Sequence, residues 1–123
     1  MEIRKIKANG NEYQFVNSSR GNRSGFVHET TLFKNDYEIA DYKCQYYNRT
    51  WECYTYQTVM RCCVDAEIKR EYDRFINKYK DQHNIKRMTA EKRAEAEKEF
   101  YSREDIKELQ KVYKALELNG HGF

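Results

Sequence analysis

Apolar and polar side chains alternate along the first 50 residues, in short runs that turn signals separate. Tyr13 and Phe15 share one side of an extended run, because successive side chains of a strand point to opposite faces. The preceding Asn9-Gly10 pair accepts positive φ at both central positions of a tight turn. The pattern therefore predicts a hairpin whose first strand is residues 3–7 and whose second strand is residues 13–17.

The segment after this hairpin divides into a polar part and an alternating part. Residues 18–25 are polar and include two glycines, a composition typical of loops. Residues 26–33 alternate again, with Thr30 and Leu32 on one face and the residues between them on the other. We therefore expect a loop over 18–25 and a third strand over 26–33.

A fourth strand is predicted over residues 37–47. The preceding Asn35-Asp36 pair is a second tight-turn signal, because both side chains tolerate a left-handed backbone. Along the strand the apolar positions change parity near Ile39-Ala40. A β-bulge produces this change because it adds one residue to a strand.

The hydrophobic spacing changes to three and four residues from Tyr56 onward, which is the repeat of a helix. This spacing continues to Tyr79 and predicts one helix from about residue 55 to 82. At 1.5 Å per residue such a helix is roughly 40 Å long. Its second half has a narrower apolar stripe than its first, so we expect part of it to extend beyond the sheet.

Two shorter helices are predicted near residues 90–101 and 103–118. Thr89 precedes a run of strong helix formers and is a suitable N-cap for the first of them. Ser102 precedes Glu104 and Asp105, whose negative charge suits the first turn of a helix. We therefore expect Ser102 to cap the last helix.

Strands come before helices, which predicts an α+β fold with a four-stranded, mostly antiparallel sheet packed by the long helix. The 123 residues fit a single domain, with a sheet part over 1–53 and a helical part over 54–123. We expect the core to include Phe15, Phe26, Leu32, Tyr42, Met60, Cys63, Val64 and Ile68.

Charge narrows the classes of function. The chain has 23 basic and 20 acidic residues, a net charge of +3, which argues against an acidic protein that imitates DNA. The first residues are charged and lack the apolar segment of a signal peptide. No run approaches the roughly 20 apolar residues of a membrane span. We therefore expect a cytoplasmic protein with no membrane partner.

The cysteines and histidines give no pattern of a metal or catalytic site. Cys44, Cys53, Cys62 and Cys63 lack the two-to-four-residue spacing of structural zinc sites. Buried free thiols in a reducing cytosol are the expected state. No histidine pair, nucleophile signature or glycine-rich phosphate loop is present. We therefore expect no cofactor, no metal, no disulfide and no enzymatic activity.

A row of basic residues on the long helix is the most informative polar feature. Arg70, Arg74 and Lys78 stand four residues apart and therefore on one side of the helix. Such like charges repel, and a phosphate backbone would relieve the repulsion. The alternative is that Glu67 and Glu71 neutralise the row in a solvated, ion-paired face. A later basic cluster comprises Lys80, Lys86 and Arg87.

The strand-to-helix corner is rich in aromatic residues and contains the run Tyr46-Tyr47-Asn48-Arg49-Thr50-Trp51-Glu52. Trp51 suits a buried anchor of this corner. Alternatively, aromatic and arginine side chains together are typical of an interaction hot spot. An exposed sheet face around Lys43, Tyr47 and Arg49 is therefore a second candidate contact surface.

This run, followed by Tyr56-Gln57-Thr58-Val59-Met60-Arg61, resembles small proteins of phages and mobile elements of Gram-positive bacteria, anti-CRISPR inhibitors among them. The resemblance covers about residues 25–65. It implies a non-catalytic inhibitor in the cytoplasm of the bacterial host, which binds an RNA-guided nuclease or its guide RNA. The contact surface is then expected on the basic helix row and the later cluster.

The alternative is a nucleic-acid-binding module of a phage or mobile element, which contacts the nucleic acid through its sheet or its helices. Antiparallel strands followed by a helix occur in proteins that place a sheet in the major groove of DNA. In such a module Lys43, Tyr47 and Arg49 face the DNA.

Overall fold

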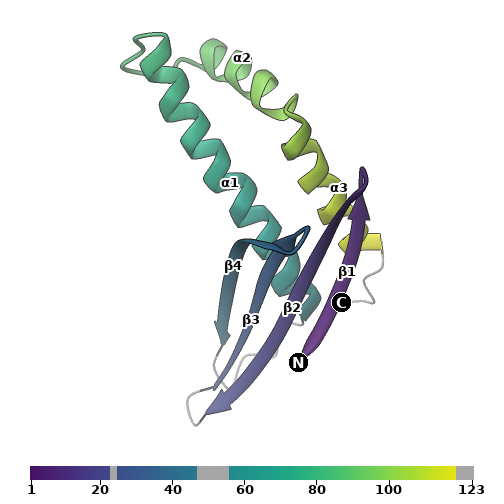
Figure 1. Cartoon of the computed structure of the whole chain (residues 1–123). Helices are drawn as coiled ribbons and strands as arrows, with labels where there is room; N and C mark the ends of the chain where they lie inside the picture. Colours follow the sequence, from purple (N-terminus) through teal and green to yellow (C-terminus); the bar gives the residue numbers. More distant parts are fainter. Residues whose placement is uncertain (23–24, 47–55, 119–123) are drawn as a thin grey trace.

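Within residues 1–22, 25–46 and 56–118, which the computed structural model describes, the chain forms a four-stranded antiparallel sheet and three helices (Figure 1). This confirms the α+β class and the predicted order of elements. The strands are β1 (Glu2–Ala8), β2 (Asn11–Asn22), β3 (Gly25–Lys34) and β4 (Tyr37–Tyr46). The helices are α1 (Tyr56–Gln82), α2 (Ala90–Tyr101) and α3 (Glu104–Leu118).

Each strand pairs with the next one along the chain, so the order in the sheet is β1-β2-β3-β4. Two of the connecting turns have the backbone conformation that their sequences predict. φ is 52° at Asn9 and 81° at Gly10, and it is 49° at Asn35 and 70° at Asp36. Positive φ at both central residues matches the twist of the flanking strands, so these turns fix the register of both hairpins.

The loop predicted over residues 18–25 is wrong, because β2 continues to Asn22 and β3 begins at Gly25. Ser18 pairs with Glu29 and Gly21 pairs with Phe26, in register with the rest of the hairpin. Backbone hydrogen bonds hold these residues in the sheet whatever their side chains. The polar composition therefore marks the exposed end of a long hairpin.

The predicted β-bulge is present in β4. Leu32 pairs with Ala40 and Phe33 pairs with Glu38, so Ile39 is the extra residue. Its carbonyl accepts a hydrogen bond of 3.4 Å from Nη2 of Arg70 on α1. The bulge thus connects the edge strand to the long helix.

Among the described elements, helices cover one face of the sheet only. α1 packs against β3 and β4, and α3 packs against β1 (Figure 1). Five of the predicted core residues are buried there, and Tyr42 and Ile68 pack against them half-buried. The side chain of Phe26 lies outside the described part. The buried five are Phe15, Leu32, Met60, Cys63 and Val64.

The second half of α1 extends beyond the sheet, as its narrow apolar stripe predicts, and α2 runs back along it (Figure 1). We call residues 70–101 the helical hairpin. Aromatic rings fill the space between its helices: Phe100 lies 5.3 Å from Tyr72 and 5.5 Å from Phe75, measured between ring centroids. This apolar seam is continuous with the core under the sheet, because Phe100 belongs to the same buried cluster as Tyr13 and Phe15.

The helix ends agree in part with the sequence. Thr89 caps α2, since its Oγ1 accepts a hydrogen bond of 3.2 Å from the backbone N–H of Lys92. Ser102 does not begin α3 as expected. Its hydroxyl donates to the carbonyl of Glu99 at 2.6 Å, and it is the C-cap of α2. In the described residues, no helix combines the length and apolar character that a membrane crossing requires.

Candidate nucleic-acid interface

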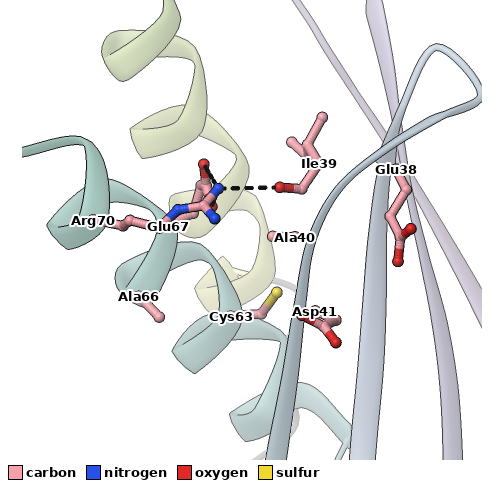
Figure 2. A pocket seen from close by; sticks show the side chains of 8 residues that line it. All are labelled: Glu38, Ile39, Ala40, Asp41, Cys63, Ala66, Glu67 and Arg70. Atoms are coloured by element: carbon pink, nitrogen blue, oxygen red, sulfur yellow. Dashed lines mark hydrogen bonds and ion pairs between the residues drawn. The ribbon is translucent and has the colours of Figure 1, made fainter. Parts of the chain in front are cut away.

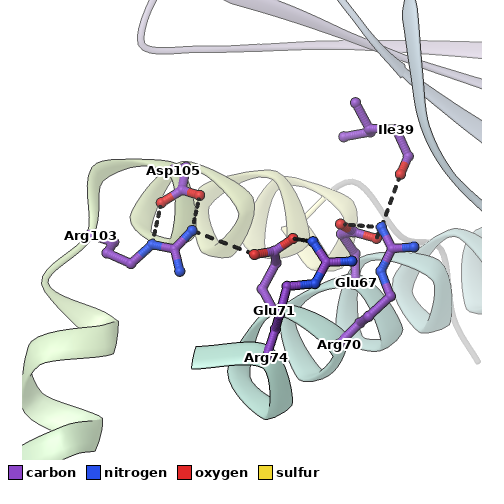
Figure 3. Close-up of polar contacts among 7 residues, drawn as sticks. All are labelled: Ile39, Glu67, Arg70, Glu71, Arg74, Arg103 and Asp105. Carbon is purple, nitrogen blue, oxygen red and sulfur yellow. Dashed lines mark hydrogen bonds and ion pairs between the residues drawn. The ribbon is translucent and has the colours of Figure 1, made fainter. Parts of the chain in front are cut away.

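The first two arginines of the basic row on α1 are ion-paired. Nη2 of Arg70 lies 2.7 and 2.6 Å from the two carboxylate oxygens of Glu67, whose side chain is only 10% exposed (Figure 3). Nη1 of Arg74 lies 3.3 Å from Oε1 of Glu71. The hydrogen bond and charge of Glu67 raise the pKa of Arg70 above its ordinary value. In this part of the row, Glu67 and Glu71 therefore neutralise the two arginines, as the alternative interpretation of the sequence expects.

Arg103 extends this network from α1 to the start of α3. Its Nη2 lies 3.6 Å from Oε2 of Glu71 and 2.7 Å from Oδ2 of Asp105 (Figure 3). Its Nε donates a second hydrogen bond of 3.0 Å to Asp105. Glu71 therefore lies between Arg74 and Arg103, and the charges in this part of the row are balanced within the protein.

The remaining cations of the predicted helix surface and of the later basic cluster have no such partners. Within the described part of the chain, no carboxylate oxygen lies within 4.0 Å of the charged nitrogens of Lys78, Lys80, Lys86 or Arg87. All four belong to the end of the helical hairpin that is farthest from the sheet (Figure 1). We call residues 78–93 the hairpin tip.

The hairpin tip concentrates the positive charge of the protein. It contains six basic and two acidic residues, whereas the net charge of the whole chain is only +3. The rest of the molecule is thus nearly neutral. A surface of one sign at the end of a projecting element attracts polyanions before contact is made.

The sheet face is a weaker candidate. Lys43 lies on the uncovered face, where its Nζ is 3.7 Å from Oε2 of Glu29 on the neighbouring strand. A second pair, Lys5 with Glu12 at 3.9 Å, lies on the same face. The other two predicted residues of this surface, Tyr47 and Arg49, lie outside the described residues, as does Trp51. Because Lys43 and Lys5 are each paired with a glutamate, their positive charge is partly neutralised and would attract DNA less.

A hollow of about 460 Å³ lies between β4 and α1 (Figure 2). The thiol of Cys63 borders it, and burial, with the nearby charges of Glu67 and Asp41, raises the pKa of this thiol to about 12. The thiol is therefore protonated at neutral pH and is a poor nucleophile. The residues that line the hollow are Glu38, Ile39, Ala40, Asp41, Cys63, Ala66, Glu67 and Arg70.

In the described segments, no disulfide joins the cysteines, which are Cys44, Cys62 and Cys63. Cys53 lies outside those segments. No group of three potential metal-ligating side chains comes together in the described residues.

A second hollow, of about 310 Å³, lies at the hairpin tip and was not predicted from the sequence. It is lined by Tyr79, His83, Ile85, Lys92 and Glu95, which come from the end of α1, the following turn and α2. The sequence could have predicted that the rings of Tyr79 and His83 are neighbours, because residues four apart on a helix lie next to each other.

Comparison with known proteins gives no match: no family model, curated protein or solved structure is significantly similar to this chain.

Proposed function

We propose that this protein acts by binding, without catalysing a reaction, and that its hairpin tip contacts the phosphates of RNA. The observation that carries the proposal is the position of the unpaired cations. Lys78, Lys80, Lys86 and Arg87 gather at one end of the molecule, whereas Arg70 and Arg74 are paired with glutamates of their own helix.

The physical argument is electrostatic. Like charges that are close together repel, and each like-charged pair one helical turn apart costs a few tenths of a kcal/mol. Phosphates remove this repulsion and release condensed counterions from the nucleic acid. The fold supports such contact because the helical hairpin holds the tip away from the sheet, where a long strand can reach it without obstruction (Figure 1).

A salt titration of RNA binding tests the proposal. With three or four phosphate contacts, the logarithm of the binding constant should fall with the logarithm of salt concentration at a slope of about −2 to −3 for a single strand. The variant Lys86→Gln/Arg87→Gln should bind more weakly and reduce the magnitude of the slope by about one or more. Fluorescence anisotropy of a labelled single-stranded RNA provides the measurement.

The matched control is Lys69→Gln/Lys114→Gln. It removes the same two charges from exposed helix positions away from the hairpin tip. We expect it to keep nearly the slope of the unmodified protein. Equal weakening by both double variants would mean that net charge alone drives binding. An absence of RNA binding at low salt, with retention of an acidic protein instead, would replace RNA with a protein partner.

A narrower proposal concerns the biological role. The protein inhibits an RNA-guided nuclease in the bacterial cytoplasm, and a phage or mobile element supplies it. This proposal rests on the resemblance of residues 46–61 described above. Of that run, Tyr46 lies in the described part at the end of β4, and so does Tyr56–Arg61 at the start of α1, where Val59 and Met60 are buried.

A cleavage assay tests the narrower proposal. Purified protein is added to a guide-loaded Cas9-type nuclease of a Gram-positive bacterium before its target DNA. Cleavage should fall in proportion to the protein added, and the Lys86→Gln/Arg87→Gln variant should inhibit less. Unchanged cleavage, together with intact RNA binding, would leave a nucleic-acid-binding module as the function.

A further inference from the structure

The hollow at the hairpin tip is built by a defined helix end. Asn84 has a left-handed backbone with φ of 52°. The N–H of Ile85 donates a hydrogen bond of 2.8 Å to the carbonyl of Lys80. The N–H of Asn84 donates a hydrogen bond of 3.4 Å to the carbonyl of Asp81. This pair of bonds is a Schellman motif, which fixes the chain as it leaves a helix. The part of the hollow formed by the end of α1 and the following turn is therefore held by backbone hydrogen bonds in the free protein.

One wall of the hollow is aromatic and apolar. The rings of Tyr79 and His83 are 4.3 Å apart between centroids, at an angle of 40°. Tyr79 is buried and His83 is exposed, so Tyr79 supports an imidazole that solvent can reach. Ile85 adds an apolar side chain to the same hollow. A flat, exposed ring with a buried ring beneath it is suited to stacking against another flat ring.

The residues that α2 contributes to the hollow are one positive and one negative side chain, and neither is in an ion pair. Lys92 and Glu95 are three residues apart on α2 and both line the hollow. Within the described residues, neither has an oppositely charged group within 4.0 Å. An ammonium group can only donate hydrogen bonds and a carboxylate can only accept them. The hollow therefore presents a donor and an acceptor beside an aromatic surface.

The geometry points to a binding site for one unstacked guanine base of single-stranded RNA, a site that rests on the proposed contact of the hairpin tip with RNA. Guanine presents two adjacent donors, N1–H and the 2-amino group, beside the acceptor O6. Glu95 accepts from the two donors, Lys92 donates to O6, and the base stacks on His83. In a duplex this edge is occupied by the pairing base, so the site takes a base only from a single strand.

The other three bases fit less well. Uracil has a single N–H between two carbonyl oxygens, which repel the carboxylate of Glu95. Adenine and cytosine each place a ring-nitrogen acceptor beside their one amino donor, and that acceptor also faces the carboxylate. Lys86 and Arg87 follow Ile85 directly in the chain and bind the phosphates on either side of the held base.

Binding of three labelled RNAs tests this site: a single-stranded oligouridylate, the same strand with one central guanine, and a duplex of equal length. The unmodified protein should bind the guanine-containing strand about tenfold more tightly than oligouridylate, as expected for one two-bond contact with a base edge. Glu95→Gln should reduce this ratio to near one without weakening binding of oligouridylate. Glu91→Gln, which removes the same charge one turn earlier on α2, should leave the ratio unchanged.

A second variant separates stacking from charge. His83→Ala should weaken both single strands by about tenfold, in the range of one lost base-to-aromatic stack, and leave duplex binding unchanged. If all three RNAs bind with salt-sensitive but equal affinity and Glu95→Gln changes nothing, the base site is wrong and phosphate binding by the tip stands. If no RNA binds at low salt, both proposals fall.

Discussion

The hydroxyl of Tyr13 donates a hydrogen bond of 2.5 Å to Oε1 of Glu108, and this contact joins β2 to α3 across 95 residues of sequence. The same carboxylate oxygen accepts a hydrogen bond of 2.6 Å from Nδ2 of Asn11 and lies 3.5 Å from Nζ of Lys34. Glu108 is only 6% exposed, so this acidic side chain is satisfied almost wholly by the sheet. It attaches α3 to the sheet from which the helical hairpin extends.

Replacement of Glu108 by Ala should destabilise the protein by about 1–3 kcal/mol, because it leaves the Tyr13 hydroxyl and the Asn11 amide without their partner. Urea unfolding followed by circular dichroism measures the change. The control is Glu104→Ala on the same helix, whose side chain is 85% exposed and contacts Lys107 at only 4.0 Å. That change should stay within about 0.5 kcal/mol. Equal losses would mean that the buried contacts of Glu108 add nothing to stability.

The same site should make stability depend on pH. Burial acts to raise the pKa of Glu108, but the hydrogen bonds from Tyr13 and Asn11 and the charge of Lys34 outweigh it, so the pKa lies below its ordinary value of 4.5. A carboxyl group whose pKa is lower in the folded state stabilises the fold above its unfolded pKa. This stabilisation disappears as the pH falls through the folded pKa.

The difference in unfolding free energy between the unmodified protein and Glu108→Gln should therefore be largest near pH 7 and shrink below pH 4.5. Urea midpoints at several pH values measure it. A difference that grows as the solution becomes more acidic would contradict the lowered pKa. Tyr13→Phe is a useful companion, because it removes one of the hydrogen bonds that lower the pKa and should make the dependence on pH shallower.

The order and type of the elements followed from the sequence because each depends on local patterns. The turns at Asn9-Gly10 and Asn35-Asp36 need only their own backbone preferences, and the bulge at Ile39 shows as a change of parity. The polar end of the β2–β3 hairpin could not be predicted in this way. Its pairing depends on backbone hydrogen bonds between the two strands, and the hydroxyl of Tyr56 on α1 also donates a hydrogen bond of 3.0 Å to Ser19.

The candidate site was predictable only in part. Its cations were visible in the sequence, and Glu67 stands three residues before Arg70, a spacing that allows the observed ion pair. The sequence could not show which cations lack a partner, because Arg103 reaches Glu71 from the connection between α2 and α3. The hollow at the tip likewise needs α2 to return beside α1, so that Lys92 and Glu95 meet His83.

Alkylation rates should distinguish the adjacent thiols of α1. Burial raises the pKa of both Cys62 and Cys63, but Cys63 is 1% exposed and its pKa reaches about 12, whereas Cys62 is half-buried. Because the thiolate is the reactive form, iodoacetamide at pH 8 should modify Cys62 well before Cys63. Mass spectrometry of the digested protein reports both rates. In urea the two rates should become similar, and a faster Cys63 in the folded protein would contradict its place in the core.

Replacement of Cys63 by Ser should destabilise the fold by about 1–3 kcal/mol, because the hydroxyl would be buried among apolar side chains. Cys62→Ser is the matched control and should cost less, since the half-buried hydroxyl can reach water. Thermal unfolding of both variants under reducing conditions makes the comparison. A larger loss for Cys62→Ser would mean that the two side chains exchange their roles in solution.

Charge reversal at Arg70 and at Lys78 should affect the fold differently, although both residues stand on the same side of α1. Arg70→Glu removes two hydrogen bonds from the largely buried Glu67 and places a second carboxylate beside it, at a cost of about 1–3 kcal/mol. Lys78→Glu breaks no described ion pair and should stay within about 0.5 kcal/mol. Unfolding at pH 7 measures both changes.

RNA binding should be weakened more by Lys78→Glu than by Arg70→Glu, when each protein is assayed well below its unfolding temperature. The reason is that the charge of Lys78 is not in an ion pair, whereas that of Arg70 is paired with Glu67. Loss of binding in Arg70→Glu alone, with its fold intact, would move the contact surface from the hairpin tip to the ion-paired part of α1.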